Sequence, residues 1–183
     1  MYFNTVGKVN TIDTAASALK IAVEKNIKHI VVASSRGATA KLLININDIE
    51  IICVTHANGF SEPGKSEMSQ EIRSELADLG IKVLTTTHVL SGAERGMSKT
   101  FGGAYPVEII AHSLRMLGQG TKVCVEVSIM ALDAGLIPYG EPIIAIGGSG
   151  QGADTAVIIT PSHASSIFET KIHEIICKPS CYK

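Results

Sequence analysis

The sequence predicts an open α/β fold in three layers, with a mixed sheet of about five strands between helices and the last strand antiparallel. Short β-branched runs alternate with longer segments of helical periodicity, the pattern of successive βαβ units. Hydrophobic residues make up 45% of the chain but aromatic ones only 4%, so aliphatic side chains fill the core, as in parallel sheets buried on both faces. The length of 183 residues, with no linker or repeat, predicts a single domain over 1–183.

The first half of the chain alternates between helix and strand. Alanine and leucine at spacings of three, four and seven predict a helix over 13–25, with Asn10-Thr11 as its cap. A β-branched strand follows at 29–33 and ends in a short segment of small and polar residues. Further strands are expected at 49–55 and 81–84, and helices at 39–46 and 66–79, the second of them stopped by Gly80.

The second half is expected to end in an antiparallel hairpin. The valines of segment 122–134 alternate like a strand, but its length and the closing Gly135 and Pro138 favour a helix. Strands at 142–146 and 155–160 are joined so closely that they must be antiparallel. A glycine-bearing loop at 90–103 and a helix at 105–117 ended by Gly118 precede them, and a helical turn at 162–168 and an edge strand at 171–176 follow.

The charge balance excludes several classes of partner. The 16 basic and 17 acidic side chains give a formal charge of -1 and a pI near 6.6, which is not the footprint of nucleic-acid binding or of a polybasic membrane anchor. No stretch approaches the roughly 20 apolar residues of a membrane helix. Residues 1–14 carry no secretory signal pattern. We therefore expect a cytoplasmic protein that binds neither nucleic acid nor membrane.

The four cysteines and six histidines do not form a metal-binding pattern. Cys53 and Cys124 lie in apolar runs, where a thiol buried as a small hydrophobe is expected. Cys177 and Cys181 form a C-x3-C near the end of the sequence, which is not the C-x2-C spacing of a zinc site. No metal site is expected, and a role for Cys177 and Cys181 stays open.

Small, hydroxylated and glycine residues follow several of the expected strands. In an open α/β sheet, ligands bind outside the carboxyl ends of the strands, at the point where the strand order reverses. A small-residue loop that opens a helix offers backbone N–H groups to a phosphate, and an arginine adds a charged fork. The alternative is a tight turn with a helix cap. The residues concerned are Ser34, Ser35, Arg36, Gly37, Ala38 and Thr39, then Thr55 and His56, then Thr86, and finally Gly147, Gly148, Ser149 and Gly150.

Several nucleotide and hydrolase motifs are absent. No Walker P-loop occurs, and no Rossmann glycine fingerprint stands at a strand-to-helix turn. The glycines at 147–152 join two strands and have no helix to open. A serine-hydrolase elbow is also missing there. His56 and His88, which follow strands, are either ligand or acid–base groups or solvated loop histidines.

Two sets of strings resemble a known superfamily. Segment 30–40, IVVASSRGATA, followed by IICVT at 51–55, resembles the C-terminal α/β domain of pyruvate kinases. MALDAGLIP at 130–138 and GQGADTA at 150–156 resemble the stand-alone prokaryotic members of that superfamily. The resemblance covers about residues 10–179, and SSRGATA and GQGADTA are its most specific parts.

The resemblance implies a fold, a ligand and the absence of one activity. Pyruvate kinase chemistry resides in a separate barrel domain, so no pyruvate kinase activity is expected. Stand-alone members are associated with bound flavin mononucleotide (FMN), whose phosphate would take the loop 34–39. The isoalloxazine ring would lie near Thr55, His56, Thr86, Thr100, Gly102 and Gly103, closed over by 147–150.

These inferences lead to three functional hypotheses. The first is a binding protein for FMN or a similar phosphorylated small molecule. The second is a flavin-dependent oxidoreductase, with 90–103 as a lid and His56 or His88 as proton donor. The third is a regulatory protein that senses a sugar phosphate. Whether the protein is an enzyme stays open, and a homo-oligomer is the default expectation.

Overall fold

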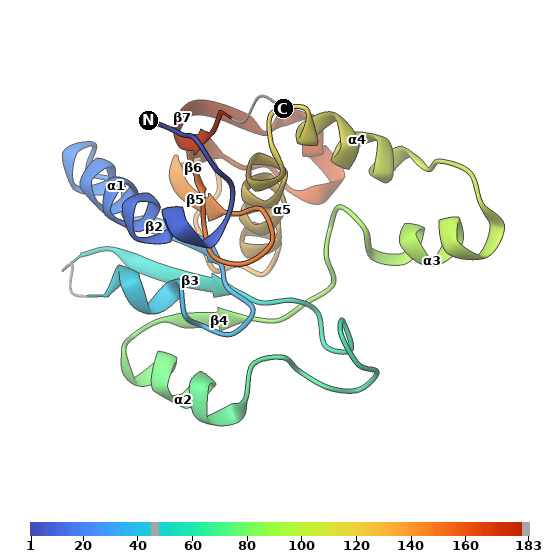
Figure 1. The fold of residues 1–183 in the computed structure, drawn as a ribbon, viewed down its shortest axis with the longest axis horizontal. Coiled ribbons are helices and arrows are strands. Elements are labelled where there is room, and N and C mark those ends of the chain that lie inside the picture. The colour runs from blue at the N-terminus through green and yellow to red at the C-terminus, as the bar shows by residue number, and fades with distance from the viewer. Residues whose placement is uncertain (45–47, 181–183) are drawn as a thin grey trace.

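A mixed sheet of seven strands, in the order β1-β7-β6-β5-β2-β3-β4, forms the middle layer of the computed structural model (Figure 1). The structure describes residues 1–44 and 48–180. The strands are β1 (Tyr2–Phe3), β2 (His29–Ala33), β3 (Glu50–Val54), β4 (Lys82–Leu84), β5 (Ile143–Gly147), β6 (Thr155–Thr160) and β7 (Lys171–Pro179). The α-helices are α1 (Thr11–Glu24), α2 (Gln70–Asp78), α3 (Gly92–Phe101), α4 (Pro106–Arg115) and α5 (Gln119–Asp133), and short 3-10 helices are η1 (Lys8–Asn10), η2 (Ala40–Leu43) and η3 (Ala164–Glu169).

The sheet confirms the predicted α/β class and its mixture of directions. Strands β5, β2, β3 and β4 are parallel, and β6 is antiparallel to both β5 and β7. The sheet is wider than the expected five strands. The last strand was expected at the sheet edge, but β1 pairs with it in parallel and covers its outer side.

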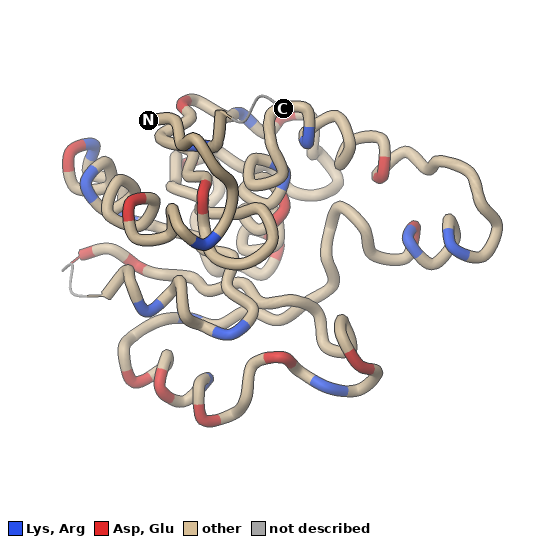
Figure 2. The backbone as a smooth tube through the Cα atoms, in the orientation of Figure 1, with Lys and Arg blue, Asp and Glu red and all other residues tan. Residues whose placement is uncertain are grey.

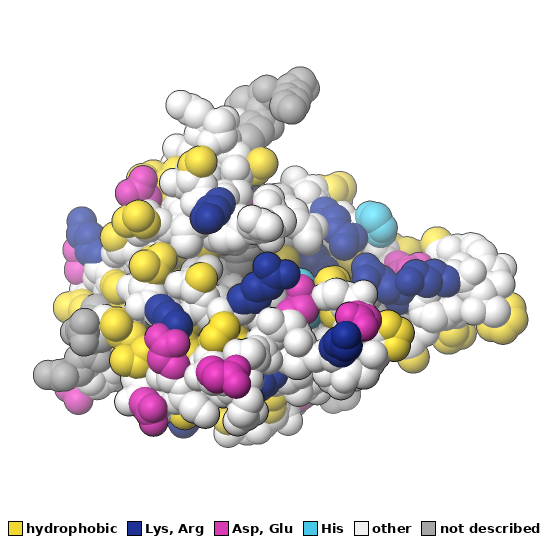
Figure 3. All heavy atoms as spheres, turned by 60° about the horizontal axis from the view of Figure 1, so that its bottom comes forward, with side chains coloured by type: hydrophobic (Ala, Val, Ile, Leu, Met, Phe, Trp, Pro, Cys, Tyr) yellow, Lys and Arg dark blue, Asp and Glu magenta, His cyan; other side chains and the backbone are white. Residues whose placement is uncertain are grey.

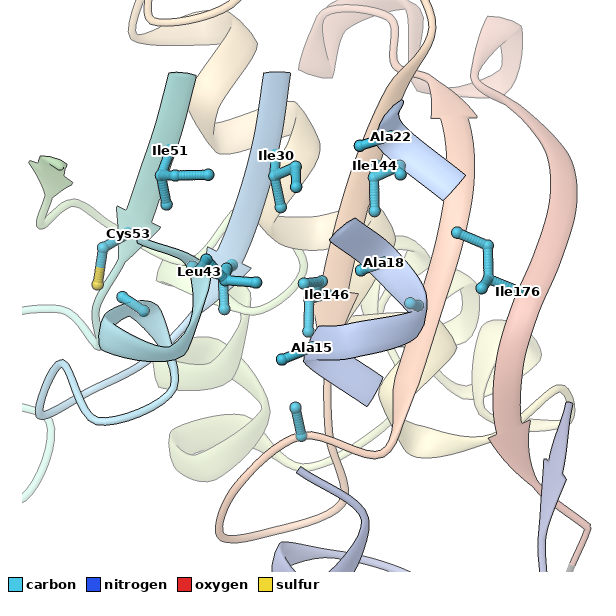
Figure 4. Close-up of a cluster of buried hydrophobic side chains, with 14 of the residues drawn as sticks. Ala15, Ala18, Ala22, Ile30, Leu43, Ile51, Cys53, Ile144, Ile146 and Ile176 are labelled. Carbon is cyan, nitrogen blue, oxygen red and sulfur yellow. The ribbon is translucent and has the colours of Figure 1, made fainter. Parts of the chain in front are cut away.

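Helices cover both faces of the sheet, and each face has its own aliphatic cluster. On one face α1 presents Ala15, Ala18 and Ala22 toward Ile144 and Ile146 of β5 (Figure 4). Because the alanines are small, the helix lies close to the sheet. Both isoleucines are 0% exposed, and burying each one stabilises the fold by about 1.5–3 kcal/mol. Helix α5 fills the other face, with buried residues along nearly its whole length.

Three cysteine side chains are part of these clusters. Cys53 in β3, Cys124 in α5 and Cys177 in β7 are buried free thiols. Burial raises the pKa of the Cys53 thiol to about 12, despite the nearby Arg73. Burial likewise raises the pKa of Cys124 and of Cys177. Cys53 and Cys124 therefore pack as small hydrophobes, as predicted, while Cys181 lies outside the described residues.

Two of the predicted segments are wrong. The helix expected at 39–46 is only the 3-10 helix η2, because Ile44 has an extended backbone with ψ 163° and ends it; residues 45–47 lie outside the described part. The loop expected at 90–103 contains helix α3. Gly92 and Gly96 weaken helix propensity there, each by about 1 kcal/mol relative to alanine, although Ala93, Met97 and Phe101 have helical spacing. None of the residues of α3 is buried.

The other helices agree with the sequence apart from their ends. Helix α2 begins at Gln70 because the Ser69 side chain caps it, accepting a hydrogen bond from the Ile72 N–H. Helix α1 begins at Thr11, but Asn10 makes no side-chain cap and donates from Nδ2 to the Thr5 carbonyl instead. Gly80 and Gly135 follow the C-caps of α2 and α5 with positive φ angles, as expected, whereas Gly118 lies two residues beyond the C-cap of α4 and is itself the N-cap of α5.

Helices α3 and α4, called the arm below, lie on the path from β4 to α5 and extend away from the sheet (Figure 1). The arm carries both signs of charge, with Arg95, Lys99 and Arg115 beside Glu94 and Glu108, whereas Asp and Glu predominate on α2 (Figure 2). Along the described ranges, no helix combines the length and apolar character required to cross a bilayer.

Candidate functional site

The strand order reverses at β2, which has β3 on one side and β5 on the other. Ligands bind at such a point in open α/β sheets. The loops that leave β2 and β5 at this edge are 34–39 and 148–154. The structure therefore brings the two sequence-predicted glycine loops to the same edge of the sheet.

The loop after β2 is partly closed on itself. The buried Ser34 accepts a hydrogen bond at Oγ from the Thr39 N–H at 3.2 Å. Gly37 has φ +79°, and a Cβ there would lie 3.0 Å from Ile72 of α2. Glycine is thus required by the turn and by packing, while Ser35 is half-buried and Arg36 and Ala38 are exposed.

The loop after β5 encloses a carboxylate of the chain itself. Asp154 is fully buried and accepts hydrogen bonds from the Gly7 N–H at 2.8 Å, the Ser149 N–H at 3.1 Å and the Thr155 hydroxyl at 2.8 Å. This carboxylate already uses one backbone donor of the segment 147–150. A Cβ on Gly147 would lie 2.6 Å from the Gly120 carbonyl of α5, and one on Gly148 would overlap the Gly152 carbonyl, so these glycines also serve close packing.

A group of charged and ring side chains gathers beyond β2, β3 and β4. We call Arg36, His56, Phe60, Glu67 and His88 the strand-end cluster. His56 donates from Nδ1 to Glu67 Oε2, and Arg36 lies 3.7 Å from Glu67 Oε1. The rings of His56 and Phe60 stack with centroids 4.0 Å apart, and His88 lies within 5.5 Å of both. One carboxylate thus joins a cation to a surface of three rings.

Threonines tie the ends of β3 and β4 together beneath this cluster. Thr55 Oγ1 lies 2.6 Å from Thr85 Oγ1, and Arg73 of α2 donates to Thr85 at 2.6 Å. Thr86, the next residue and the one singled out from the sequence, is exposed. The alternation of side chains beyond β4 thus brings Thr85, rather than Thr86, to Thr55.

The pKa values of one carboxyl group and one imidazole ring of the cluster, Glu67 and His88, lie below their ordinary values. The hydrogen bond from His56 holds the pKa of the Glu67 carboxyl below 4.5, and Arg36 adds to this shift. Burial lowers the pKa of His88 below 6.5, although the Glu126 carboxylate opposes the shift. His88 Nε2 accepts a hydrogen bond from the Ala57 N–H at 3.2 Å, which requires an unprotonated ring nitrogen.

These shifts predict that the protein loses stability in acid. Since the folded pKa of His88 lies below 6.5, the unfolded chain binds that proton first, so the free energy of unfolding falls as pH drops from 6.5 to the folded value. The lowered pKa of Glu67 likewise makes the free energy of unfolding fall as the pH drops below 4.5. Urea unfolding at a series of pH values measures the slope. His88→Asn should flatten it below pH 6.5, and the exposed His112→Asn should not; equal slopes in all three proteins would contradict the assignment to His88.

A buried ion pair lies next to the cluster. The side chains of Lys122 and Glu126 in α5 are 8% and 7% exposed, and their charged atoms are 2.5 Å apart. Glu126 also accepts the Leu90 N–H at 3.0 Å. The pair therefore fixes the segment that joins β4 to the arm.

Comparison with known proteins places this architecture in a family. The model of the pyruvate kinase alpha/beta domain matches residues 13–159. The chain belongs to this family. Among solved structures, a pyruvate kinase from Cryptosporidium parvum is 20% identical with a TM-score of 0.43, covering 82% of this chain and 23% of its own. A pyruvate kinase of that organism in complex with ADP is 19% identical with a TM-score of 0.42, covering 81% and 22%. This chain thus spans less than a quarter of those proteins.

Within this pyruvate kinase alpha/beta domain, some predicted site residues lie apart from the rest. Thr100, Gly102 and Gly103 are exposed at the end of α3, on the arm that extends away from the sheet (Figure 1). Thr100 donates its hydroxyl to the Gly96 carbonyl at 2.8 Å. These residues are therefore not brought to the loop 34–39. Over the described ranges, no three His, Cys, Asp or Glu side chains are arranged to hold a metal ion.

Other residues of this alpha/beta domain site were missed from the sequence. Phe60 and Glu67 both lie in the connection between β3 and α2. Their meeting with His56 depends on how that connection folds back, which no spacing rule encodes. The only local signal was Phe60, the one Phe, Tyr or Trp residue in the connection 55–69.

Proposed function

We propose that this protein binds a phosphorylated small molecule with a planar ring, with FMN as the candidate ligand, at the strand-end cluster. The observation that supports this is the position of Glu67 between Arg36 and His56. It sets a guanidinium beside a surface of stacked rings, at the edge of the sheet where ligands bind in this class of fold.

The ring surface suits a planar heterocycle. Phe60 is 48% exposed, although it stacks on His56 with an angle of 27° between the rings. Aromatic pairs of this kind contribute about 0.5–1.5 kcal/mol beyond their buried area. An isoalloxazine ring would extend the stack, near Thr55 and the β4 end.

The phosphate would take the loop 34–39 with Arg36. The side chain of Arg36 is 71% exposed, and its ion pair with Glu67 spans 3.7 Å. The Glu67 side chain is only 18% exposed, but it keeps its hydrogen bond from His56 when Arg36 leaves. Because long pairs with an exposed partner contribute little, about 0–1 kcal/mol when both partners are exposed, a phosphate can draw the guanidinium from Glu67 at little cost. A bidentate arginine–phosphate contact is stronger and more directional. In the same proposal, the loop 147–150 closes over the isoalloxazine ring.

We also propose that this chain has no pyruvate kinase activity. It covers less than a quarter of the pyruvate kinases with which it was compared. Phosphoryl transfer needs metal ions and charged side chains arranged around the transferred group. A coupled assay for pyruvate formation tests this directly, and turnover above a buffer control would refute it.

A flavin-dependent oxidoreductase is the second candidate. The His56–Glu67 hydrogen bond resembles the arrangement in which a carboxylate orients an imidazole for proton transfer. Photoreduction of the FMN-loaded protein, followed by candidate electron acceptors, tests this. Reoxidation that slows in a His56→Gln variant with unchanged FMN affinity supports an enzyme. Equal rates in both proteins support a carrier.

A matched pair of ligands tests the binding proposal, because riboflavin has the ring of FMN without its phosphate. Arg36→Ala should weaken FMN binding about tenfold or more, the loss of one charged hydrogen bond, and leave riboflavin unchanged. Phe60→Ala should weaken both ligands about three- to tenfold. Quenching of flavin fluorescence gives the dissociation constants.

The control for this titration is Phe168→Ala, since Phe168 is 86% exposed and lies outside the cluster. It should bind both flavins like the unaltered protein. If neither flavin is quenched, or if Arg36→Ala weakens FMN and riboflavin equally, the proposed placement of the phosphate is wrong.

A further inference from the structure

A cavity of about 260 Å³ lies between the arm and α5. Leu90 and Ser91 line it where the chain leaves the sheet, Arg95 lines it from α3, and α4 and α5 form the remaining walls. It shares no lining residue with the strand-end cluster. The cavity is therefore distinct from the proposed flavin site.

Cationic side chains outnumber carboxylates around this cavity. Arg95, Arg115 and Lys122 line it together with His112, and the only carboxylate among the lining residues is Glu108. Glu108 is already engaged, since it accepts the Ser98 hydroxyl at 2.7 Å. Figure 3 shows Lys and Arg side chains next to a His where the arm leaves the body of the molecule.

The two arginines have donors to spare. Arg115 donates from Nε to Gln119 Oε1 at 2.8 Å, which fixes the side chain in place. Arg95 is exposed. Within residues 1–44 and 48–180 its guanidinium makes no hydrogen bond or salt bridge, so no protein group competes with a ligand for it. Lys122 is different, because its charge is compensated by Glu126. The arginines are thus the groups available to an anion.

We propose that this cavity is a second binding site, for a small dianion that carries a phosphate group. Two guanidinium groups that line one cavity, one from α3 and one from the end of α4, match the oxygen atoms of a phosphate. The volume lies just below the 300–1,000 Å³ of drug-sized ligand sites, which selects inorganic phosphate or a short phosphate monoester over a nucleotide.

The site has a mechanical consequence for the arm. Helix α3 has no buried residues, and Arg95 belongs to α3 whereas Arg115 belongs to α4. A dianion bound between them would neutralise two like charges and join the two helices. The arm is therefore expected to become more ordered when phosphate binds.

Calorimetric titration of the full chain with inorganic phosphate at low ionic strength tests the proposal. Arg95→Ala and Arg115→Gln should each weaken phosphate binding about tenfold, while Lys99→Ala, which removes an exposed cation of the same helix, should not. Because Arg95 has no partner in the described structure, Arg95→Ala is expected to leave the fold intact, and circular dichroism verifies this.

A second experiment locates the ion. In amide spectra, added phosphate should shift the Ser91 signal equally in the unaltered protein and in Arg36→Ala, whereas any shift of the Ser35 signal, which reports on the loop proposed for the flavin phosphate, should disappear in Arg36→Ala. Three results would overturn the proposal: no phosphate binding, equal affinity in Arg95→Ala, or a Ser91 shift that is lost in Arg36→Ala. The last would assign the ion to the loop 34–39. Loss of FMN affinity in Arg95→Ala would show that the cavity holds the flavin phosphate and is not separate.

Discussion

Replacing Lys122 by methionine is expected to lower the free energy of unfolding by about 3–5 kcal/mol, because it leaves the Glu126 carboxylate buried without its counter-ion. Both side chains are less than a tenth exposed, so water cannot take the place of the ammonium group. Methionine fills nearly the same volume, which keeps a packing defect from explaining the loss. Urea unfolding followed by circular dichroism measures the change.

A paired substitution separates charge from packing at this site. Lys122→Met combined with Glu126→Gln removes both charges, and glutamine keeps an oxygen for the Leu90 N–H. Replacing a whole buried pair by neutral groups is often close to neutral, so the double variant should regain most of the stability. If it is as unstable as the single variant, the unpaired charge is not the cause. Lys99→Met, at an exposed position of α3, should stay within about 0.5 kcal/mol of the unaltered protein.

Replacing Asp154 by alanine is expected to cost about 3–5 kcal/mol. The substitution leaves three donors around a fully buried position without their acceptor, namely the N–H groups of Gly7 and Ser149 and the hydroxyl of Thr155. Each unsatisfied buried group costs about 1–3 kcal/mol. Since one of these donors lies before α1, amide exchange at Gly7 should accelerate along with the loss of global stability.

The isosteric variant is the control for this prediction. Asp154→Asn keeps one oxygen acceptor, so it should lose about half as much stability as Asp154→Ala. Equal losses in the two variants would mean that the shape of the side chain matters rather than its acceptors. A fully stable Asp154→Ala would contradict the view that the glycine loop is held by an internal anion.

The strands of the sheet centre could be predicted because their signals are local. The run 29–33 is β-branched and bounded by polar turns, and the short link between β5 and β6 left no topology except a hairpin. Strand β1 could not be found in this way. It has only two residues, and it exists because it pairs with β7 at the other end of the chain. Such pairing leaves no mark in local composition.

Helix α3 shows the opposite limit. Two glycines weaken its helix propensity, and its apolar stripe of Ala93, Met97 and Phe101 is not buried. The segment 90–103 was expected to be a loop because of its glycines, and the helical spacing of its apolar residues was given no weight. Where burial is absent, hydrogen bonding within the backbone still decides the conformation.

The sequence indicated the edge of the sheet at which the strand-end cluster lies, but it did not indicate all the residues that form the cluster. The rule that strand ends converge was enough to bring Arg36, Thr55 and His56 to one edge. Glu67 joins them only because the connection between β3 and α2 folds back over the edge. Gly147 and Gly148 are also required by packing, because α5 and the loop itself approach them closely. Composition alone cannot distinguish glycines needed for packing from glycines that bind a phosphate.

The three buried thiols are natural labelling sites in different parts of the fold. Cys53 lies in a strand of the parallel part of the sheet, Cys124 in the helix of one face, and Cys177 in β7 near the opposite edge. The thiolate is the reactive form, and burial keeps each of these thiols protonated. Alkylation at each position must therefore wait for that element to open. In a Cys181→Ser background, the alkylation rates of these three native cysteines would rank the local stabilities of the sheet, the α5 face and the β7 edge, with no need to introduce further cysteines.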